Sequence, residues 1–213
     1  MTGLRGGRLA RLVAGQLRTP SGLGGRLIAW VMNRFNRGMH VAAAAALAPG
    51  RADRVLEVGF GGATLLEELL RRVPEGSVTG LELSETMLKG ARHRLRREIG
   101  RGRLALHEGT VDRLPFPDGA FDRVVSLNTI YFWSDAGRGL RELRRVLAPG
   151  GRLLLGYGDL DAMAAMPFTA HGFRLYQADE VEGLLRSAGF EAVVSRRHGR
   201  GRDAFVLTEA GTP

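Results

Sequence analysis

The sequence predicts a doubly wound α/β fold, in which a mostly parallel sheet of seven strands follows an N-terminal helical extension. Beyond residue 50, short runs rich in valine, leucine and phenylalanine alternate with helical stretches, which is the pattern of successive βαβ units. The last two such runs flank a short turn region and indicate a hairpin. The chain has 213 residues, of which 44% are hydrophobic, and this suits one domain with a sizeable core.

The spacing of apolar residues and the positions of breaking and capping residues predict each element in order. The first helix, over 4–17, is weakly amphipathic because apolar residues recur at helical spacing at Leu9, Leu12, Val13 and Leu17. A break at 20–22 ends it, and two further helices are expected over 25–35 and 40–47. The strands are expected at 54–58, 77–81, 104–107, 121–127, 151–157, 192–196 and 204–208. The later helices are expected over 64–73, over 85–99 with Ser84 as N-cap, over 136–147, and over 178–188 with Gly189 as C-terminal stop.

Positive charge is concentrated in the first fifty residues. The chain carries 31 Lys and Arg against 22 Asp and Glu, yet residues 1–50 hold seven arginines and no acidic residue. One interpretation is a basic arm for an anionic small molecule, a membrane surface or a nucleic acid. The other is a codon bias toward arginine, since Lys89 is the only lysine. We therefore expect a helical extension over 1–50 and a core domain over 51–213.

Composition also excludes some chemistry. The chain has no cysteine, which excludes disulfides, thiolate metal sites and a cysteine nucleophile. The longest apolar run near the N-terminus, 41–47, is too short to span a bilayer, and no secretory segment follows the first arginines. We expect a cytoplasmic protein without a metal centre.

A glycine turn follows the first predicted strand in the segment VLEVGFGGAT, residues 55–64. Gly59 and Gly61 permit a tight turn and close approach of a ligand to the backbone. Glu57, at the end of the strand, offers a negative charge to an ammonium group. A dinucleotide fingerprint would need a third glycine where Thr64 stands, and no Gly-Lys-Ser/Thr triplet of a P-loop occurs. A nicotinamide-dependent oxidoreductase is thus the disfavoured interpretation of this loop.

A second acidic residue, Glu82, ends the second predicted strand. It lies 21 residues after Gly61, close to the separation of about 20 residues expected for an acid that binds ribose hydroxyls. The spacing predicts that the Glu82 carboxylate accepts hydrogen bonds from both hydroxyls of a ribose.

At this point the sequence resembles the class I S-adenosylmethionine-dependent methyltransferases, in particular their bacterial small-molecule branch of the type 11 kind. Four segments carry the resemblance, in order and at matching spacing over most of 54–157: VLEVGFGGAT (55–64), GLELSETML (80–88), LPFPDGAFDRVVSLNTIYFW (114–133) and LRELRRVLAPGGRLLL (140–155). The resemblance implies a Rossmann-like methyltransferase fold and S-adenosyl-L-methionine as cofactor.

The resemblance also implies roles at matching positions. Glu57 would meet the methionine amino group, Glu82 the ribose hydroxyls, and the backbone around Thr110 and Val111 the edge of the adenine. The other implied cofactor-binding residues are Gly59, Gly61, Leu83, Met87 and Asn128. One departure stands at Thr110, where related sequences often carry an aspartate for the adenine amino group; Asp112 comes two residues later.

Methyl transfer from a sulfonium is an in-line displacement, so the protein acts mainly by alignment, which is worth roughly 7–11 kcal/mol. We expect His171 as the general base and Tyr131 as a second catalytic group. Asn33, Asn36 and Trp133 are expected to line the acceptor pocket, with residues 1–50 as a lid over it.

The expected partner is a small-molecule acceptor, with an anionic one favoured by the arginines. Residues 128–131 lack the two prolines of nucleic-acid amino-methyltransferases, so no nucleic-acid partner is expected. The alternatives left open are a non-catalytic cofactor-binding partner protein, a nucleic-acid or lipid methyltransferase, an NAD-dependent oxidoreductase, and a peripheral membrane contact through the basic N-terminus. The sequence determines neither the methylated atom nor the oligomeric state.

Overall fold

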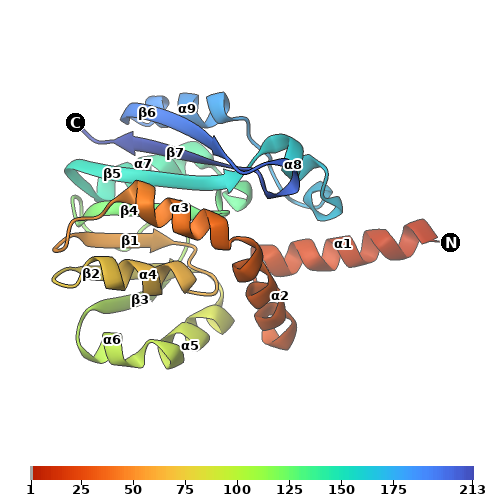
Figure 1. The fold of residues 1–213 in the computed structure, drawn as a ribbon, viewed down its shortest axis with the longest axis horizontal. Coiled ribbons are helices and arrows are strands. Elements are labelled where there is room, and N and C mark those ends of the chain that lie inside the picture. Colours follow the sequence, from red (N-terminus) through yellow and green to blue (C-terminus); the bar gives the residue numbers. More distant parts are fainter. Residues whose placement is uncertain (1) are drawn as a thin grey trace.

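The computed structural model describes residues 2–213, except for the side chains of residues 2–6 and of Arg26. A seven-stranded sheet in the order β3-β2-β1-β4-β5-β7-β6 forms its centre (Figure 1). The strands from β3 to β5 pair in parallel, and β7 is antiparallel to both β5 and β6. Their bounds are β1 Arg54–Val58, β2 Ser77–Glu82, β3 Leu104–Glu108, β4 Phe121–Leu127, β5 Leu147–Gly158, β6 Glu191–His198 and β7 Phe205–Gly211. This confirms the predicted fold class.

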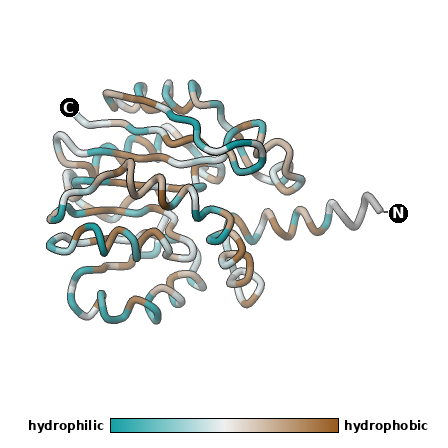
Figure 2. The backbone as a smooth tube through the Cα atoms, viewed as in Figure 1, coloured by the Kyte–Doolittle hydropathy of each residue, from teal (hydrophilic) through white to brown (hydrophobic). Residues whose placement is uncertain are grey.

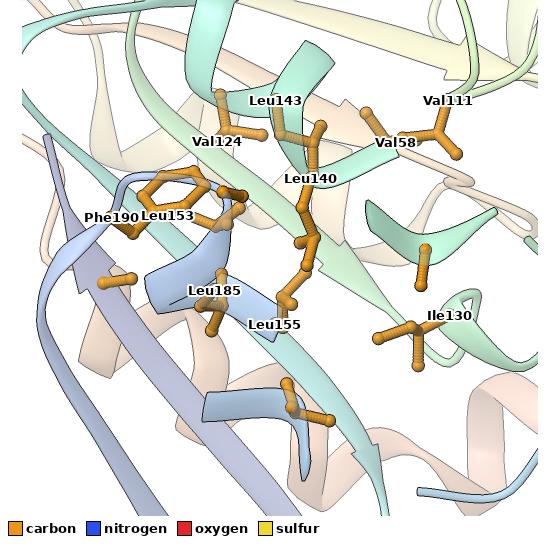
Figure 3. Packing of buried hydrophobic residues seen from close by; sticks show 14 of the residues in the cluster. Val58, Val111, Val124, Ile130, Leu140, Leu143, Leu153, Leu155, Leu185 and Phe190 are labelled. Atoms are coloured by element: carbon orange, nitrogen blue, oxygen red, sulfur yellow. The ribbon is translucent and has the colours of Figure 1, made fainter. Parts of the chain in front are cut away.

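Helices cover both faces of the sheet and create two apolar cores. On one face, α3, α4 and α5 pack against the strands, and on the other α7 and α9 do so. Figure 3 shows part of the second core, where Leu140 and Leu143 of α7 approach Leu153 and Leu155 of β5. The helix bounds are α1 Thr2–Arg18, α2 Gly22–Phe35, α3 Arg37–Leu47, α4 Thr64–Arg72, α5 Glu85–Arg94, α6 Arg96–Gly100, α7 Ala136–Val146, α8 Leu160–Ala164 and α9 Ala178–Ser187, with 3₁₀ turns η1 Ile130–Phe132, η2 Pro167–Ala170 and η3 Gly201–Asp203.

The buried stripes follow the sequence pattern directly. In α7, Leu140, Leu143 and Val146 recur at helical spacing and are fully buried. The residues between them are charged, and they are exposed or half-buried: Arg141, Glu142, Arg144 and Arg145. Each such leucine contributes about 1.5–3 kcal/mol by leaving water. Strand β5 is apolar on consecutive residues because helices cover both of its faces.

The expected helix over 85–99 is instead two helices that meet at Leu95. The backbone of Leu95 leaves helical geometry, and its side chain is buried in the core beside α5 while the flanking arginines stay exposed. The irregularity lets one apolar residue reach the core from a segment that is otherwise charged. The predicted caps are confirmed: Ser84 Oγ accepts a hydrogen bond from Met87 N at 3.3 Å, and Gly189 has a positive φ of 87° just after α9.

The three N-terminal helices pack in two different places. Helix α3 lies on the sheet and contributes Met39, Ala43 and Leu47 to a core, whereas α1 and α2 lie beyond the carboxyl ends of the parallel strands (Figure 1). Of the apolar residues expected on one side of α1, Leu9 and Leu12 are exposed. The boundary at residue 50 stays a prediction. None of the helices searched in the described chain is long and apolar enough to cross a membrane.

Candidate cofactor and acceptor site

A cavity of about 560 Å³ opens at the carboxyl ends of β1, β2, β4 and β5. In open α/β sheets this edge is where ligands bind. The glycine turn and both acidic strand ends line the cavity, the end of α1 and the inner side of α2 close it from above, and η2 contributes from the side. The predicted motifs, the N-terminal helices and η2 therefore meet at one place.

The glycine turn has the backbone that its sequence predicts. Gly59 and Gly61 have positive φ values of 76° and 46°, and Ala63 adopts the left-handed region before α4 begins. A Cβ on Gly59 would overlap Thr129 Cγ2, whereas a Cβ on Gly61 would meet nothing within 4 Å. Gly59 is thus required by packing against the β4 end, and Gly61 leaves open space beside a cavity wall.

Glu82 anchors the turn. Its Oε2 accepts a hydrogen bond from Gly61 N at 2.9 Å, and its Oε1 accepts one from Ser84 N at 2.9 Å. Burial raises the pKa of this carboxyl, and the backbone N–H groups of Ser84 and Gly61 partly offset that rise. Because each carboxylate oxygen has a further lone pair, Glu82 can hold the turn and still accept hydrogen bonds from a ribose.

Glu57 is the less satisfied of the two acids. It is 4% exposed, its Oε2 is buried, and that oxygen has no hydrogen-bond partner among the described residues. Burial, followed by the nearby charge of Glu82, raises the pKa of Glu57 to about 8. A buried carboxylate without a partner is strongly disfavoured, so the site favours a ligand that brings a positive charge to it.

Asn33 of α2 rests on the same turn. A Cβ placed on Gly62 would overlap Asn33 Nδ2 and lie 2.7 Å from its Cγ, so the carboxamide occupies the space that a side chain would need. Asn36, at the end of α2, also lines the cavity. Both predicted residues therefore lie on the cavity wall, and their role as a cap over the cofactor stays a prediction.

The contact predicts the behaviour of two variants. Gly62→Ala should displace the Asn33 carboxamide from the turn and weaken cofactor binding. The free energy of unfolding should fall by only about 1 kcal/mol, because the new methyl group meets the end of a flexible side chain. Asn33→Ala in the same chain should recover most of the lost unfolding free energy, whereas cofactor affinity should stay lowered because Asn33 itself lines the cavity. Thermal unfolding with and without S-adenosylhomocysteine measures this coupling. Gly90→Ala, at an open position of exposed α5, is the matched control and should leave stability unchanged or slightly raised; additive losses in the double variant would contradict the contact.

Asn128 and Tyr131 form a connected pair at the end of β4. Asn128 has a positive φ of 57°, and its Oδ1 accepts a hydrogen bond from the Tyr131 hydroxyl at 3.3 Å. The same hydroxyl accepts a hydrogen bond from Gly158 N, and burial raises the pKa of Tyr131 well above its ordinary value. Tyr131 therefore stays protonated and is suited to orienting neighbours, rather than to taking up a proton.

The remaining predicted residues on the cavity wall have mixed surroundings. Leu83, Thr110, Val111 and Trp133 all line it. The Trp133 indole N–H donates a hydrogen bond to Thr129 Oγ1 at 3.2 Å, and its ring lies against Gly139 of α7. Trp133 is therefore part of the cavity wall and also packs against the core helix α7.

Two predicted residues lie elsewhere. Met87 is buried in the apolar core under α5, and His171 follows η2; neither lines the cavity. Met87 lies in the first turn of α5 and packs into the apolar core on that face of the sheet. The roles assigned to these two residues remain predictions without support from their positions.

Sequence reasoning missed two residues that do line the cavity. Asp112 has a buried Oδ1 without a partner among the described residues, while its Oδ2 accepts from Ser134 Oγ at 3.0 Å. His40, in α3, has a buried Nδ1 that likewise meets no partner in the described chain, and burial lowers the pKa of its imidazole. Asp112 was not predicted because it lies two residues beyond Thr110, the position at which related sequences often carry an aspartate. His40 lies outside all the motifs, so no local signal marked His40.

The polar groups of this cavity suit S-adenosylmethionine. Its amino acid part carries an ammonium group for Glu57, its ribose carries hydroxyls for Glu82, and the turn after β1 leaves backbone close to both. The orphaned oxygen of Glu57 is the observation that this cofactor explains and that an anionic nicotinamide dinucleotide does not.

Comparison with known proteins gives the same result. A methyltransferase domain model matches residues 56–155. The uncharacterized methyltransferase YdaC of Bacillus subtilis is 32% identical over 143 residues, which cover 67% of this chain and 74% of YdaC. The demethylmenaquinone methyltransferase of Deinococcus radiodurans is 37% identical over 122 residues, and the chain spans about half of its length (49%).

A solved structure supports the fold. The SAM-dependent methyltransferase of Thermotoga maritima matches with a TM-score of 0.66 at 26% identity, over 86% of this chain and 92% of that one. The domain match extends from β1 to β5, where the glycine turn and both carboxylates lie, and YdaC is covered over most of its length. The chain therefore belongs to the class I S-adenosylmethionine-dependent methyltransferases.

Proposed function

We propose that this protein methylates a small-molecule acceptor that has a largely apolar body. The observation that carries the proposal is the part of the cavity beyond the glycine turn. Methionine and phenylalanine side chains from α2, the 160–173 segment and β7 contribute to the cavity wall: Met32, Met163, Met166, Phe168, Phe173 and Phe205. Flexible thioethers and aromatic rings favour an apolar, ring-containing ligand. The Deinococcus relative, whose name gives demethylmenaquinone as acceptor, supports a small-molecule acceptor of this kind.

In this proposal the cofactor supplies an activated methyl group, and the protein supplies alignment. Glu57 receives the ammonium, Glu82 the ribose hydroxyls, and the unpartnered Oδ1 of Asp112 the adenine amino group. Asn33 and Asn36 cover the cofactor from α2. The apolar wall excludes water from the nucleophile, and pre-alignment of this kind supplies roughly 7–11 kcal/mol of the rate enhancement.

An acceptor that carries a proton on its nucleophilic atom also needs a base. His40 is better placed for this than His171, because it lines the cavity and burial lowers its pKa, which keeps the imidazole neutral near pH 7. Arg18 and Arg202, also on the wall, suit an acceptor with an anionic substituent.

The test is methyl transfer from labelled cofactor to a panel of phenols, quinols, carboxylic acids and amines, with mass spectrometry of the products. We expect methylation of an apolar, ring-containing member. His40→Gln should lower turnover of a protonated acceptor and flatten the pH dependence of its rate. Transfer only to protein or nucleic acid in a parallel panel would contradict the proposal.

The closing role of α1 is part of the same proposal. Ser84 Oγ donates a hydrogen bond to Pro20 O, and Gly22 N donates to Thr86 Oγ1 at 3.3 Å, so the segment between α1 and α2 is tied to the start of α5. Deleting residues 1–24 should leave a folded sheet by circular dichroism but lower S-adenosylhomocysteine affinity, since this cover and its hydrogen bonds are lost. Calorimetric titration measures the affinity. Full affinity and full turnover in the truncated chain would remove the lid role.

A further inference from the structure

Four large apolar side chains form one stripe on the outer side of α2. Leu23, Leu27, Trp30 and Val31 recur at helical spacing, and their exposed fractions are 82%, 62%, 65% and 48%. The inner side of the same helix is also apolar, where it meets the cavity. A surface helix of a water-soluble domain ordinarily carries charged and polar residues on its outer side, so this stripe needs a partner.

Exposed arginines lie on the same helix as the stripe and on the two helices that adjoin it in the chain. The described arginines of α1, α2 and the start of α3 are all exposed, and none has an ion-pair or hydrogen-bond partner in the described chain: Arg8, Arg11, Arg18, Arg34 and Arg37. No acidic residue occurs in residues 1–50 to neutralise them. Leu9 and Leu12 of α1 are exposed between these arginines, at 64% and 68%. The surface is therefore both apolar and strongly basic.

The position of this surface is defined by the fold. Helix α1 projects from the body of the molecule, α2 lies beside its base, and both are at the end of the sheet where the cavity opens (Figure 1). Figure 2 shows hydrophobic residues along both helices. Phe35, at the end of α2, is half exposed and also lines the cavity, so the stripe continues to the cavity rim.

We propose that α1 and α2 dock this protein on the surface of a membrane that contains anionic lipid, with Leu23, Leu27 and Trp30 entering the interfacial layer. Tryptophan and leucine are side chains that such a layer accepts, and arginines keep their guanidinium groups at the head groups while their stems pack below. A second copy of the chain fits this surface less well, because face-to-face contact would bring two sets of uncompensated arginines together. The inference is independent of which acceptor is methylated.

The test uses the full-length protein and sedimentation with two kinds of vesicle. One contains phosphatidylglycerol and phosphatidylcholine in equal parts, and the other contains phosphatidylcholine alone. We expect binding to the anionic vesicles only, weakened by added salt. Trp30→Ala and Leu27→Ala should each lower the partition constant roughly tenfold or more, since each removes a large buried apolar group. Arg34→Gln should lower it about fivefold.

Matched controls lie on other surfaces. Val194→Ala removes an exposed apolar side chain from β6, and Arg141→Gln removes an exposed arginine from α7. Neither should change the partition constant by the amounts given for α2. Because the chain has two tryptophans, Trp133→Phe leaves Trp30 as the fluorophore. Its emission should shift to the blue on anionic vesicles and be quenched by brominated lipid.

Three results would overturn the proposal: no binding to either vesicle, equal binding to both, or binding without quenching of Trp30. Light scattering distinguishes membrane docking from dimerisation through the stripe. A stable dimer that Trp30→Ala dissociates would assign the stripe to a second copy of the chain. Cofactor affinity, measured in the same Trp30→Ala protein, should be unchanged, which separates failure of docking from failure of the proposed methyl transfer.

Discussion

Replacing Glu82 with alanine is expected to lower affinity for S-adenosylhomocysteine by at least about a hundredfold. The carboxylate would lose charge-assisted hydrogen bonds to both ribose hydroxyls, and each bond of this kind contributes about 1.5–3 kcal/mol. The same change leaves Gly61 N and Ser84 N without their acceptors, so the glycine turn loses its anchor as well. Calorimetric titration of the variant and the unchanged protein measures the loss.

Glu82→Gln is the informative companion variant. A carboxamide has one oxygen, whereas the turn presents two N–H donors on opposite oxygens, at Gly61 and Ser84. One donor would therefore face the NH₂ group, and the affinity loss should remain large although size and shape are kept. Circular dichroism should show an intact fold in both variants. Unchanged cofactor affinity in Glu82→Ala would take Glu82 out of the site.

The cofactor-free protein is expected to lose stability as pH rises from about 5.5 to about 8.5, by roughly 3 kcal/mol at Glu57 alone. Glu57 has a pKa of about 8 in the folded protein, against 4.5 for an ordinary glutamate. Between these values the folded state binds the proton and the unfolded state does not, so the free energy of unfolding falls as pH rises through this window. Above both pKa values the full penalty of the buried charge is present.

Glu57→Gln isolates this contribution, because it removes the titrating group at nearly constant volume. The difference in unfolding free energy between the two proteins, measured by urea titration across pH, should grow in favour of the variant as pH rises. The comparison at each pH is needed because His40, whose pKa is lowered by burial, acts oppositely and destabilises the fold as pH falls below about 6.5.

Bound ligand should reverse the effect. S-adenosylhomocysteine carries an ammonium group, which favours the charged form of Glu57, so its affinity for the unchanged protein should rise between about pH 6 and pH 8. In Glu57→Gln that rise should be absent. A pH-independent difference in stability, together with the same pH profile of affinity in both proteins, would show that Glu57 does not face the cofactor.

Some features of this protein could be predicted from local sequence. Alternating strands and helices set the order of the sheet elements, and the bounds of β1 and β4 agree with those expected. Gly59, Gly61, Glu57 and Glu82 were found because chain connectivity alone places strand ends and the turn after β1 at one edge of a parallel sheet. Close spacing along the chain, in such cases, implies closeness in space.

Other features depend on contacts between distant segments. The break at Leu95 arises because one apolar residue in a charged segment is drawn into the core under α5. Met87 was expected at the cofactor, yet its helix directs it into the same core. The sequence alone does not distinguish His40 from His171 as a candidate base. Only the packing of α3 over the sheet brings His40 to the cavity wall.

The sequence by itself determined the fold class and the acidic pair, because hydrophobic periodicity, glycine conformations and strand-end positions are local properties. The cofactor was implied by the resemblance of four sequence segments to the class I methyltransferases. Only the tertiary structure decided which residues lie beyond the turn. Asn33 reaches Gly62, and Glu57 and Asp112, each with a buried oxygen that has no partner in the described chain, line one cavity. They meet there because elements far apart in the chain fold over the sheet edge together. Both sides of α2 are apolar, so the sequence alone does not tell which side faces solvent. Only the packing of α2 over the cavity shows that Leu23, Leu27, Trp30 and Val31 are the exposed ones.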